Sequence, residues 1–483
     1  MHSKRHRFVM FYKTGAKKDG TLTASEASLY SDTGAYATIG PLVITRATVH
    51  ATGPYIIPNV KTDGYCICTN NTIAGSFRGF GEPQSLFAAE SQIDELASEL
   101  GLDPLELRMR NILRPASATA TSQQLDASVG LEECLRKVTA AVGWKNKSHE
   151  VSANKKRGFG LAAIYHGNSL GPEGLDRSRA RLTLDRDGVV TVRLGLTEYG
   201  TGARSGITQI VAETIGIEAS SVRLGAVDTL TCPDSGGTFA SRTLVLGGRA
   251  AQRAAELLRT KMIEAAAEQL QSSSDEIEIH RGVLSVRCDP NRSMTLKALS
   301  AKLCEHGELT VDGEYTAEAC DFDSEKGYGT PYHQYTFGAI ATEVEVDLKL
   351  GYVTPIRLIA AYDVGKAINP HLVEGQIEGA TSQAVGLALM EEIVHSKGHV
   401  MNPNLSDYYI PTSLDMPEVT PIIVEYAGSI GPFGAKSIGE PPIDGPAAAL
   451  TNAIFNAIQI RIRDLPATPE KILLALKNPG RSV

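Results

Sequence analysis

One loop stands out in this chain: Gly434-Ala435-Lys436-Ser437-Ile438-Gly439-Glu440-Pro441-Pro442. It places a carboxylate, Glu440, after a glycine-containing run, and the two prolines that follow fix φ and lack a backbone N–H. Gly445-Pro446 then predicts the start of a helix, because proline is favoured at the first helical position. That helix should bury a stripe formed by Leu450, Ile454, Ile458 and Ile462. A carboxylate on a stiff loop anchored by a core helix suits a general base; the alternative is a tight turn whose Glu faces solvent.

Length and composition indicate a globular protein of two or more units. The chain has 483 residues, of which 42% are hydrophobic and 21% are charged. Its formal net charge of −8 argues against a general nucleic-acid binder. No apolar run reaches the roughly 18–20 residues that a membrane span needs, and the basic start Met1–Arg7 leads into no apolar signal core. We therefore expect neither nucleic acid nor a membrane as a partner.

The seven cysteines are scattered, and the one close pair is Cys66-Ile67-Cys68. That spacing suits neither a zinc site nor an iron–sulfur cluster. Free thiols are typical of a reducing compartment, so we expect a cytoplasmic protein.

Two glycine-rich loops each lead into a helix. A hairpin over Arg181–Leu194 delivers Glu198-Tyr199-Gly200-Thr201-Gly202 to a helix that Gly216 should end. The segment Asp228–Thr243 precedes a longer helix, expected from about Leu244 to Leu270. Free amides at a helix N-terminus attract anions. Two such loops predict a large anionic ligand.

A third candidate binding segment comprises Asn369-Pro370 and Gln376-Ile377-Glu378-Gly379, on a helix that follows a second hairpin through Lys349–Gly351. The sequence contains no GxxxxGK[ST] motif, and neither glycine-rich loop is a GxGxxG turn in a βαβ unit. ATPase and NAD-binding interpretations are therefore excluded.

The first part of the chain combines strands with helices. Phe77-Arg78-Gly79-Phe80-Gly81 places two glycines around an aromatic ring, which lets backbone approach a ligand closely. Pro83 can open a helix that Gly101 ends, and another helix is expected near Leu131–Val142. The charged segment Lys145–Arg157 predicts a boundary between two units, 1–155 and 156–483.

Five motifs occur here in the order found in molybdenum hydroxylases. They are Phe77-Arg78-Gly79-Phe80-Gly81 with Pro83-Gln84, Glu198-Tyr199-Gly200-Thr201-Gly202, Ala240-Ser241-Arg242, Gln376-Ile377-Glu378-Gly379 and Gly439-Glu440-Pro441-Pro442. Over essentially its whole length the chain resembles the C-terminal part of the molybdopterin-binding large subunit of the xanthine dehydrogenase and aldehyde oxidase family. An earlier GGxFG-type segment of that family is absent, which implies either a split subunit or a truncated product.

The resemblance implies an α+β fold of two mixed α+β subdomains. Residues 1–155 would be the remainder of the first molybdopterin-binding subdomain, and residues 156–483 the second, with the catalytic Glu loop. The implied cofactor is molybdenum–molybdopterin, with the cytosine dinucleotide form as one option. Its dithiolene holds the metal, so no side chain of this chain has to bind molybdenum.

The same resemblance places a set of residues at the cofactor. They are Phe77, Arg78, Gly79, Gly200, Thr201, Gly202, Phe239, Ala240, Ser241, Arg242, Thr243 and Gln376. One of them, Thr201, stands where the family commonly has Gln. Glu440 is implied as the general base of a hydroxylase that inserts a water-derived oxygen into a C–H bond.

Partner chains are implied as well. Two electrons must leave the site, and the family passes them through iron–sulfur clusters to a flavin. Neither group has a recognisable site in this sequence. The expected partners are a 2Fe-2S subunit, an FAD subunit and a chain that carries the N-terminal part of the molybdenum domain.

Arg46 and Phe80 are the residues expected to bind the substrate. Xanthine dehydrogenases place an arginine near the position of Arg46, which holds a substrate oxygen, and an aromatic ring at the position of Phe80. The expected substrate is an aromatic N-heterocycle, first of all a purine such as xanthine or hypoxanthine. Nicotinate-type or aldehyde hydroxylation, and an inactive truncated assembly fragment, are the alternatives. For Arg46 itself, an ordinary surface ion pair is the simpler interpretation.

Overall fold

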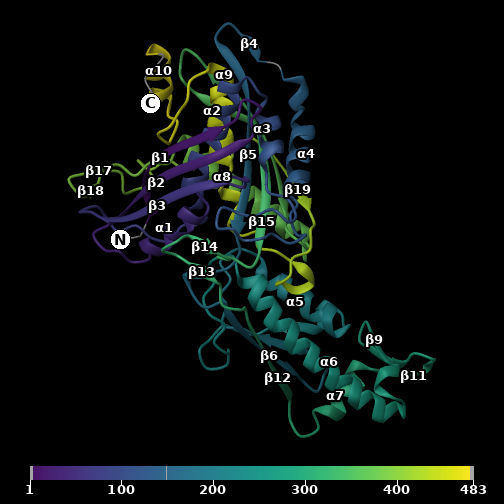
Figure 1. Cartoon of the computed structure of the whole chain (residues 1–483). Helices are drawn as coiled ribbons and strands as arrows, with labels where there is room; N and C mark the ends of the chain where they lie inside the picture. Colours follow the sequence, from purple (N-terminus) through teal and green to yellow (C-terminus); the bar gives the residue numbers. More distant parts are fainter. Residues whose placement is uncertain (1–3, 148, 479–483) are drawn as a thin grey trace.

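In the computed structural model, which describes residues 4–147 and 149–478, a five-stranded sheet lies at the centre of the larger lobe (Figure 1). Its strand order is β19 (Glu418–Val424), β16 (Val353–Asp363), β15 (Tyr335–Asp347), β5 (Lys155–Gly167) and β4 (Glu150–Ser152). The β19–β16 pair is parallel and the others are antiparallel. The β15–β16 pair confirms the hairpin predicted through Lys349–Gly351. Residues 1–3 of the basic start lie outside the described residues.

Strand β5 is covered on both faces, as its sequence requires. Residues 158–165 form a continuous apolar run, which is typical of a strand buried on both sides. Successive side chains point to opposite faces. Leu161 and Ala163 pack in one core cluster with helix α4 (Leu131–Val142), whereas Ala162 and Ile164 pack in another with α9 (Pro446–Ile458).

Helix α9 lies directly against the backbone of β5. A Cβ on Gly160 would lie 1.9 Å from the carbonyl oxygen of Ala449, so only glycine permits this approach. The helix ends at Ile458, where Gln459 adopts a left-handed conformation with φ 57°. Ile462 is buried in the segment after the helix, so the predicted stripe was one turn too long.

A three-stranded sheet with three helices precedes the central sheet in the chain. Its order is β1 (Arg7–Ala16), β2 (Leu22–Gly34) and β3 (Asn59–Cys68), and the helices are α1 (Gly40–Val49), α2 (Glu82–Leu100) and α3 (Pro104–Asn111). The helix predicted after Pro83 is therefore confirmed as α2, with Gly101 as its left-handed C-cap. The helix predicted near Leu131–Val142 is α4.

The elements from β6 to β12 form a second lobe, drawn in teal in Figure 1, that extends away from the central sheet. It contains the sheet β12 (Leu309–Thr316), β6 (Arg177–Leu184), β7 (Val190–Arg193), β8 (Val222–Leu224) and the sheet β11 (Asp289–Thr295), β10 (Val283–Val286), β9 (Ile277–His280). Its helices are α5 (Ala203–Ile215), α6 (Gly248–Leu270) and α7 (Leu296–Leu303). The predicted hairpin is β6–β7. The predicted long helix begins with a π-helical turn, η4 (Thr243–Gly247).

The remaining elements are α8 (Pro370–Leu389), α10 (Pro469–Lys477) and the small hairpins β13 (Phe322–Asp323) with β14 (Tyr328–Gly329) and β17 (His395–Ser396) with β18 (His399–Val400). The mixture of helices with mainly antiparallel sheets confirms the α+β class. One core cluster joins Leu22 and Ile112 to Phe337 and Ile359, so the predicted units 1–155 and 156–483 share a core. Their division at residue 155 stays a prediction. Among the described residues, no helix is long and apolar enough to cross a bilayer.

The β5–α9 contact can be tested by stability. We expect Gly160→Ala to lower the free energy of unfolding by about 1–3 kcal/mol, because an extra methyl in a packed core forces backbone shifts. Gly379→Ala, on an exposed part of α8 where the added methyl meets nothing within 4 Å, is the control. It should be neutral or stabilise by about 0.5–1 kcal/mol. Denaturant titration measures both, and an unchanged midpoint for Gly160→Ala would contradict the contact.

Candidate functional site

A cavity of about 500 Å³ lies where the Glu440 loop meets two glycine-rich loops and helix α8. Its walls are residues from the segments 76–78, 199–206, 238–244, 364–376 and 436–440, together with Gln383. Arg78 and Gly439, which are 361 residues apart in the chain, thus meet at one site. Each of the five motifs singled out in the sequence contributes to the wall.

Glu440 faces this cavity with its side chain 14% exposed. Its Oε1 accepts a hydrogen bond from the backbone N–H of Gly79 at 3.3 Å, and its Oε2 accepts one from the hydroxyl of Ser241 at 3.1 Å. These two donors come from two different walls and hold the carboxylate in place. Among the described residues that line the cavity, Glu440 is the one carboxylate, and none is Cys or His.

Arg78 ties three walls together. Its Nε donates to the carbonyl oxygen of Gly439 at 2.5 Å, its Nη2 to Oε1 of Gln376 at 2.8 Å, and its Nη1 to Oε1 of Gln383 at 3.1 Å. Burial lowers the pKa of Arg78. The Arg78 turn, the Glu440 loop and α8 are therefore held in one arrangement.

The loop at 238–243 carries backbone strain beside Glu440. Ala240 and Ser241 are consecutive non-glycine residues with positive φ, 52° and 50°. Such conformations cost roughly 1–3 kcal/mol each and gather at functional sites. The hydroxyl of Ser437 donates to the carbonyl oxygen of Ser241 at 2.8 Å, which fixes the strained loop to the Glu440 loop.

The anion site predicted at the start of α5 needs a correction. Oε1 of Glu198 accepts the backbone N–H groups of Gly200 at 2.8 Å and Thr201 at 2.5 Å, and Oε2 accepts that of Arg204 at 3.3 Å. Burial alone would raise the pKa of Glu198, but these donors outweigh it and lower that pKa. The chain's own carboxylate therefore occupies the amides that were expected to bind a ligand. Gly200, Thr201 and Gly202 still line the cavity.

Arg242 also needs a correction. Its Nη1 lies 3.2 Å from Oδ1 of Asp176, and its Nη2 donates to the carbonyl oxygen of Arg177 at 3.0 Å. The side chain is buried in these contacts and does not line the cavity, unlike its neighbours Phe239, Ala240, Ser241 and Thr243.

The structure contradicts the substrate contact predicted for Arg46. The guanidinium is fully buried and forms a two-point ion pair with Glu173, with Nε–Oε1 and Nη2–Oε2 both at 3.0 Å. Burial alone would lower the pKa of Arg46, but Glu173 outweighs it and raises that pKa. On the other edge, Nη1 donates to the carbonyl oxygen of Gly167 at 3.0 Å, so the whole guanidinium is engaged inside the protein. The predicted aromatic partner, Phe80, lies with its ring 5.8 Å from this guanidinium and does not line the cavity.

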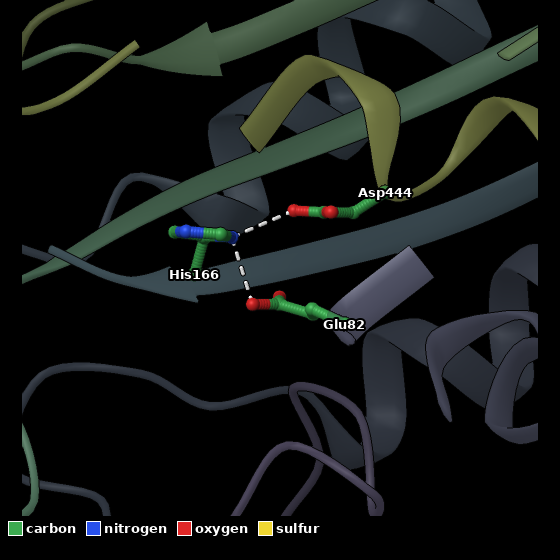
Figure 2. Close-up of side chains that lie close together, drawn as sticks. All are labelled: Glu82, His166 and Asp444. Carbon is green, nitrogen blue, oxygen red and sulfur yellow. Dashed lines mark hydrogen bonds and ion pairs between the residues drawn. The ribbon is translucent and has the colours of Figure 1, made fainter. Parts of the chain in front are cut away.

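Sequence reasoning missed a buried polar cluster next to Glu440, drawn in Figure 2. Glu82 comes from α2, His166 from β5, and Asp444 from the turn between η7 (Pro441–Ile443) and α9. All three side chains are fully buried. Among the described residues, this is the group of His and carboxylates with the spacing of metal ligands. Glu82 and Asp444 each lie next to one of the five motifs in the sequence. A charged residue among apolar neighbours at such a position was the signal that could have predicted this cluster.

Two family profiles match the chain. Residues 137–417 and residues 1–112 each match a molybdopterin cofactor-binding domain. The chain belongs to this family. It is a member of the molybdenum hydroxylases, as the ordered motifs implied.

Relatives of this member include a putative xanthine dehydrogenase molybdenum-binding subunit of Escherichia coli K12, which is 34% identical over 97% of the chain and 62% of that protein. A probable xanthine dehydrogenase subunit of Bacillus subtilis is 34% identical over 99% of the chain and 63% of that protein. The solved aldehyde oxidoreductase of Desulfovibrio gigas is 32% identical, with a TM-score of 0.84 over 98% of the chain and 50% of that structure. The chain therefore spans about half to three fifths of these relatives.

The cavity suits a pterin cofactor of the kind this family binds. Its volume lies in the usual range for ligand sites, roughly 300–1,000 Å³. Its wall combines amides and hydroxyls, from Gln376, Gln383, Ser437 and Thr243, with apolar and aromatic faces. No described residue of this wall is Cys or His, and its one carboxylate is too few for a protein-built metal site, which fits a metal held by the pterin itself.

The buried ion pair between Arg46 and Glu173 should contribute to the stability of the fold. Arg46→Met should lower the free energy of unfolding by about 3–5 kcal/mol, because it leaves Glu173 buried and unpaired. The double variant Arg46→Met/Glu173→Leu should recover much of that loss, since it removes both charges. Denaturant titration of the two variants gives the comparison.

The matched control is Arg136→Met, which breaks an exposed pair with Glu132 and should change stability by no more than about 1 kcal/mol. An Arg46→Met variant as stable as this control would contradict the buried ion pair.

Proposed function

We propose that the chain is the catalytic, molybdenum-cofactor-binding part of a xanthine dehydrogenase-like hydroxylase. It would insert a water-derived oxygen into a C–H bond of an aromatic N-heterocycle, first of all a purine such as xanthine or hypoxanthine. The observation that carries the proposal is the position of Glu440. Held by two donors, it is the single carboxylate among the described residues that line a cavity where all five family motifs meet.

The cofactor would be held by the amide of Gln376, the loop at 238–243 and the hydroxyl of Ser437, which line the cavity. When bound, it supplies the oxygen atom and accepts two electrons. The cytosine dinucleotide form belongs to the proposal, as do a 2Fe-2S subunit and an FAD subunit that carry the electrons away. A cytoplasmic location also belongs to it.

Glu440 would act as the general base. Its carboxylate faces the cavity, while Gly79 and Ser241 donate to its two oxygens and fix its orientation. From there Oε1 or Oε2 can take up the proton released by the attacking oxygen, a step in which a positioned base is commonly worth roughly 10²–10⁴ in rate. The prolines at 441 and 442 remove backbone donors and stiffen the loop that carries this base.

Three observations support an aromatic substrate. Exposed rings of Phe77, Tyr199 and Phe239 border the cavity, and such faces suit a flat ring. Two of the relatives are named as xanthine dehydrogenase subunits. A quinoline 2-oxidoreductase from Pseudomonas putida 86 has the same fold, with a TM-score of 0.87 and 27% identity over 99% of the chain and 62% of that structure. An aldehyde is the second candidate, since an aldehyde oxidoreductase of Megalodesulfovibrio gigas is 33% identical over 98% of the chain and 49% of that protein.

Glu440→Gln tests the role of the base. We expect unchanged molybdenum and pterin content but a loss of roughly 10²–10⁴ in kcat, because the amide cannot accept the proton. The matched control is Glu378→Gln, an exposed residue of a neighbouring motif that does not line the cavity, and it should keep wild-type turnover. Retention of more than about a tenth of the activity by Glu440→Gln would show that this carboxylate is structural.

A substrate panel on the purified assembly tests the substrate class. Xanthine, hypoxanthine, nicotinate, quinoline and aliphatic aldehydes should be compared by kcat/KM. We expect a purine to rank first, because aromatic faces border the cavity. A higher kcat/KM for aliphatic aldehydes than for every heterocycle would overturn the substrate assignment while leaving the base assignment intact.

A further inference from the structure

The cluster of Glu82, His166 and Asp444 (Figure 2) is not part of the cavity wall, yet the His166 ring lies next to the base Glu440. Nδ1 of His166 lies 2.8 Å from Oε2 of Glu82 and 2.8 Å from Oδ2 of Asp444. On the other side of the ring, Nε2 lies 4.0 Å from Oε2 of Glu440. Two fully buried carboxyl groups thus lie beside one imidazole nitrogen, and a third carboxylate lies across the ring.

The position of the proton on His166 follows from Arg46. Nη1 of Arg46 lies 3.1 Å from Nε2 of His166, and a guanidinium can only donate hydrogen bonds. Nε2 must therefore accept, which places the imidazole proton on Nδ1. The N–H of Nδ1 is directed to Asp444, which accepts it.

Glu82 is left without a donor. The other imidazole near it belongs to His50, whose Nε2 lies 3.6 Å from Oε2 of Glu82 but accepts the backbone N–H of Gly167 at 3.1 Å. That nitrogen therefore presents a lone pair, and the His50 proton lies on Nδ1, which donates to the carbonyl oxygen of Arg46. Within the described part of the chain, neither oxygen of Glu82 accepts a hydrogen bond. A buried carboxylate without a donor is strongly disfavoured, whereas a neutral carboxylic acid has no charge to bury.

We propose that Glu82 is a neutral carboxylic acid, that Asp444 is the ionised member of the pair, and that this cluster is a positioning device for the base Glu440. The assignment rests on the proposed function for its catalytic consequence, but not for the protonation states. A divalent metal in the cluster is disfavoured by the same geometry, because Nδ1 carries a proton and has no lone pair to offer a metal.

Electrostatics support one retained proton in the pair, and the hydrogen bonds place it on Glu82. Burial, and the neighbouring Asp444, raise the pKa of Glu82 well above its ordinary value, and burial with Glu440 raises that of Asp444. Burial and Arg46 lower the pKa of His166, so the imidazole stays neutral. Within the described residues, the charged and titratable groups that face the two carboxyls include Arg5, Arg46, His50, Arg78, Glu173, His166, Glu440 and the buried tyrosines Tyr165, Tyr335 and Tyr362. Since two adjacent buried carboxyls cannot both ionise at low cost, one proton is retained.

The cluster is connected to the base through Gly79. The backbone N–H of Glu82 donates to the carbonyl oxygen of Gly79 at 3.0 Å, and the N–H of Gly79 donates to Glu440. A Cβ on Gly79 would lie 2.6 Å from Oδ1 of Asp444, so this turn rests directly on the cluster. Asp444 itself follows Glu440 in the same turn. A second buried negative charge here would repel the carboxylate of Glu440, and the neutral acid avoids that charge.

Infrared spectroscopy tests the protonation states without any assay. The purified protein should show a carboxylic-acid C=O band that persists at alkaline pH, disappears in Glu82→Gln, and remains in Asp444→Asn and Glu440→Gln. A band lost in Asp444→Asn but retained in Glu82→Gln would show that Asp444 carries the proton, which would contradict the proposal. Absence of such a band from the wild type would overturn the proposal without any variant. A stoichiometric divalent metal in the wild type, lost in Glu82→Gln, would overturn it in favour of a metal site.

The pH profile of kcat/KM tests the effect on the base. Asp444→Asn removes a negative charge near the site of proton transfer, so the acid limb of the profile should move to lower pH. Glu82→Gln replaces one neutral group by another of the same shape, so the limb should stay where it is in the wild type. A limb that moves in Glu82→Gln, or one that moves in neither variant, would contradict the positioning role. If no substrate turns over, the proposed function fails, while the infrared result still decides the state of Glu82.

Discussion

The site depends on a buried ion pair between Lys436 and Asp363. Nζ of Lys436 lies 2.6 Å from Oδ2 of Asp363, and both side chains are fully buried. Two such charges are tolerated in a core only when hydrogen bonds satisfy their remaining atoms. Nζ also donates to the carbonyl oxygen of Ser128, and the carboxylate accepts backbone N–H groups of Gly130, Gly365 and Tyr426. The pair therefore fixes the Glu440 loop to the end of β16 and to the start of α4.

Glu440 follows Lys436 by only four residues, and further contacts of the same loop restrict its conformation. Ser437 holds the strained loop at 238–243, and Arg78 holds the carbonyl oxygen of Gly439. The base is thus positioned by groups whose own conformations are fixed by hydrogen bonds, as a preorganised site requires. On the far side, the Glu82–His166–Asp444 cluster supports the turn that donates to Glu440. The position of the Glu440 carboxylate is therefore fixed by its own rigid loop, by the strained loop at 238–243 and by the cluster that holds the buried proton.

Local sequence signals predicted the helices and strands whose ends are marked by proline or glycine. Pro83 and Gly101 bound α2, and the hairpin predicted over Arg181–Leu194 is the antiparallel β6–β7 pair. The motif order also located Glu440 and Gln376 in one site. What the sequence could not show were contacts set by register and rotamer. Arg46 meets Glu173 127 residues later, and Glu198 folds back on its own amides instead of leaving them for a ligand. Neither contact can be predicted from a hydrophobic periodicity. The register of β5, which directs His166 toward Glu82 and Asp444, cannot be predicted from the sequence either.

The most direct measurement is the position of molybdenum in crystals of the cofactor-loaded protein, found by anomalous scattering at the molybdenum absorption edge. We expect a single strong peak inside the cavity, next to the carboxylate of Glu440 and bordered by Gln376 and the loop at 238–243. A peak outside this cavity, including one among Glu82, His166 and Asp444, would contradict this assignment, because the cofactor would then not occupy the cavity that the Glu440 carboxylate faces.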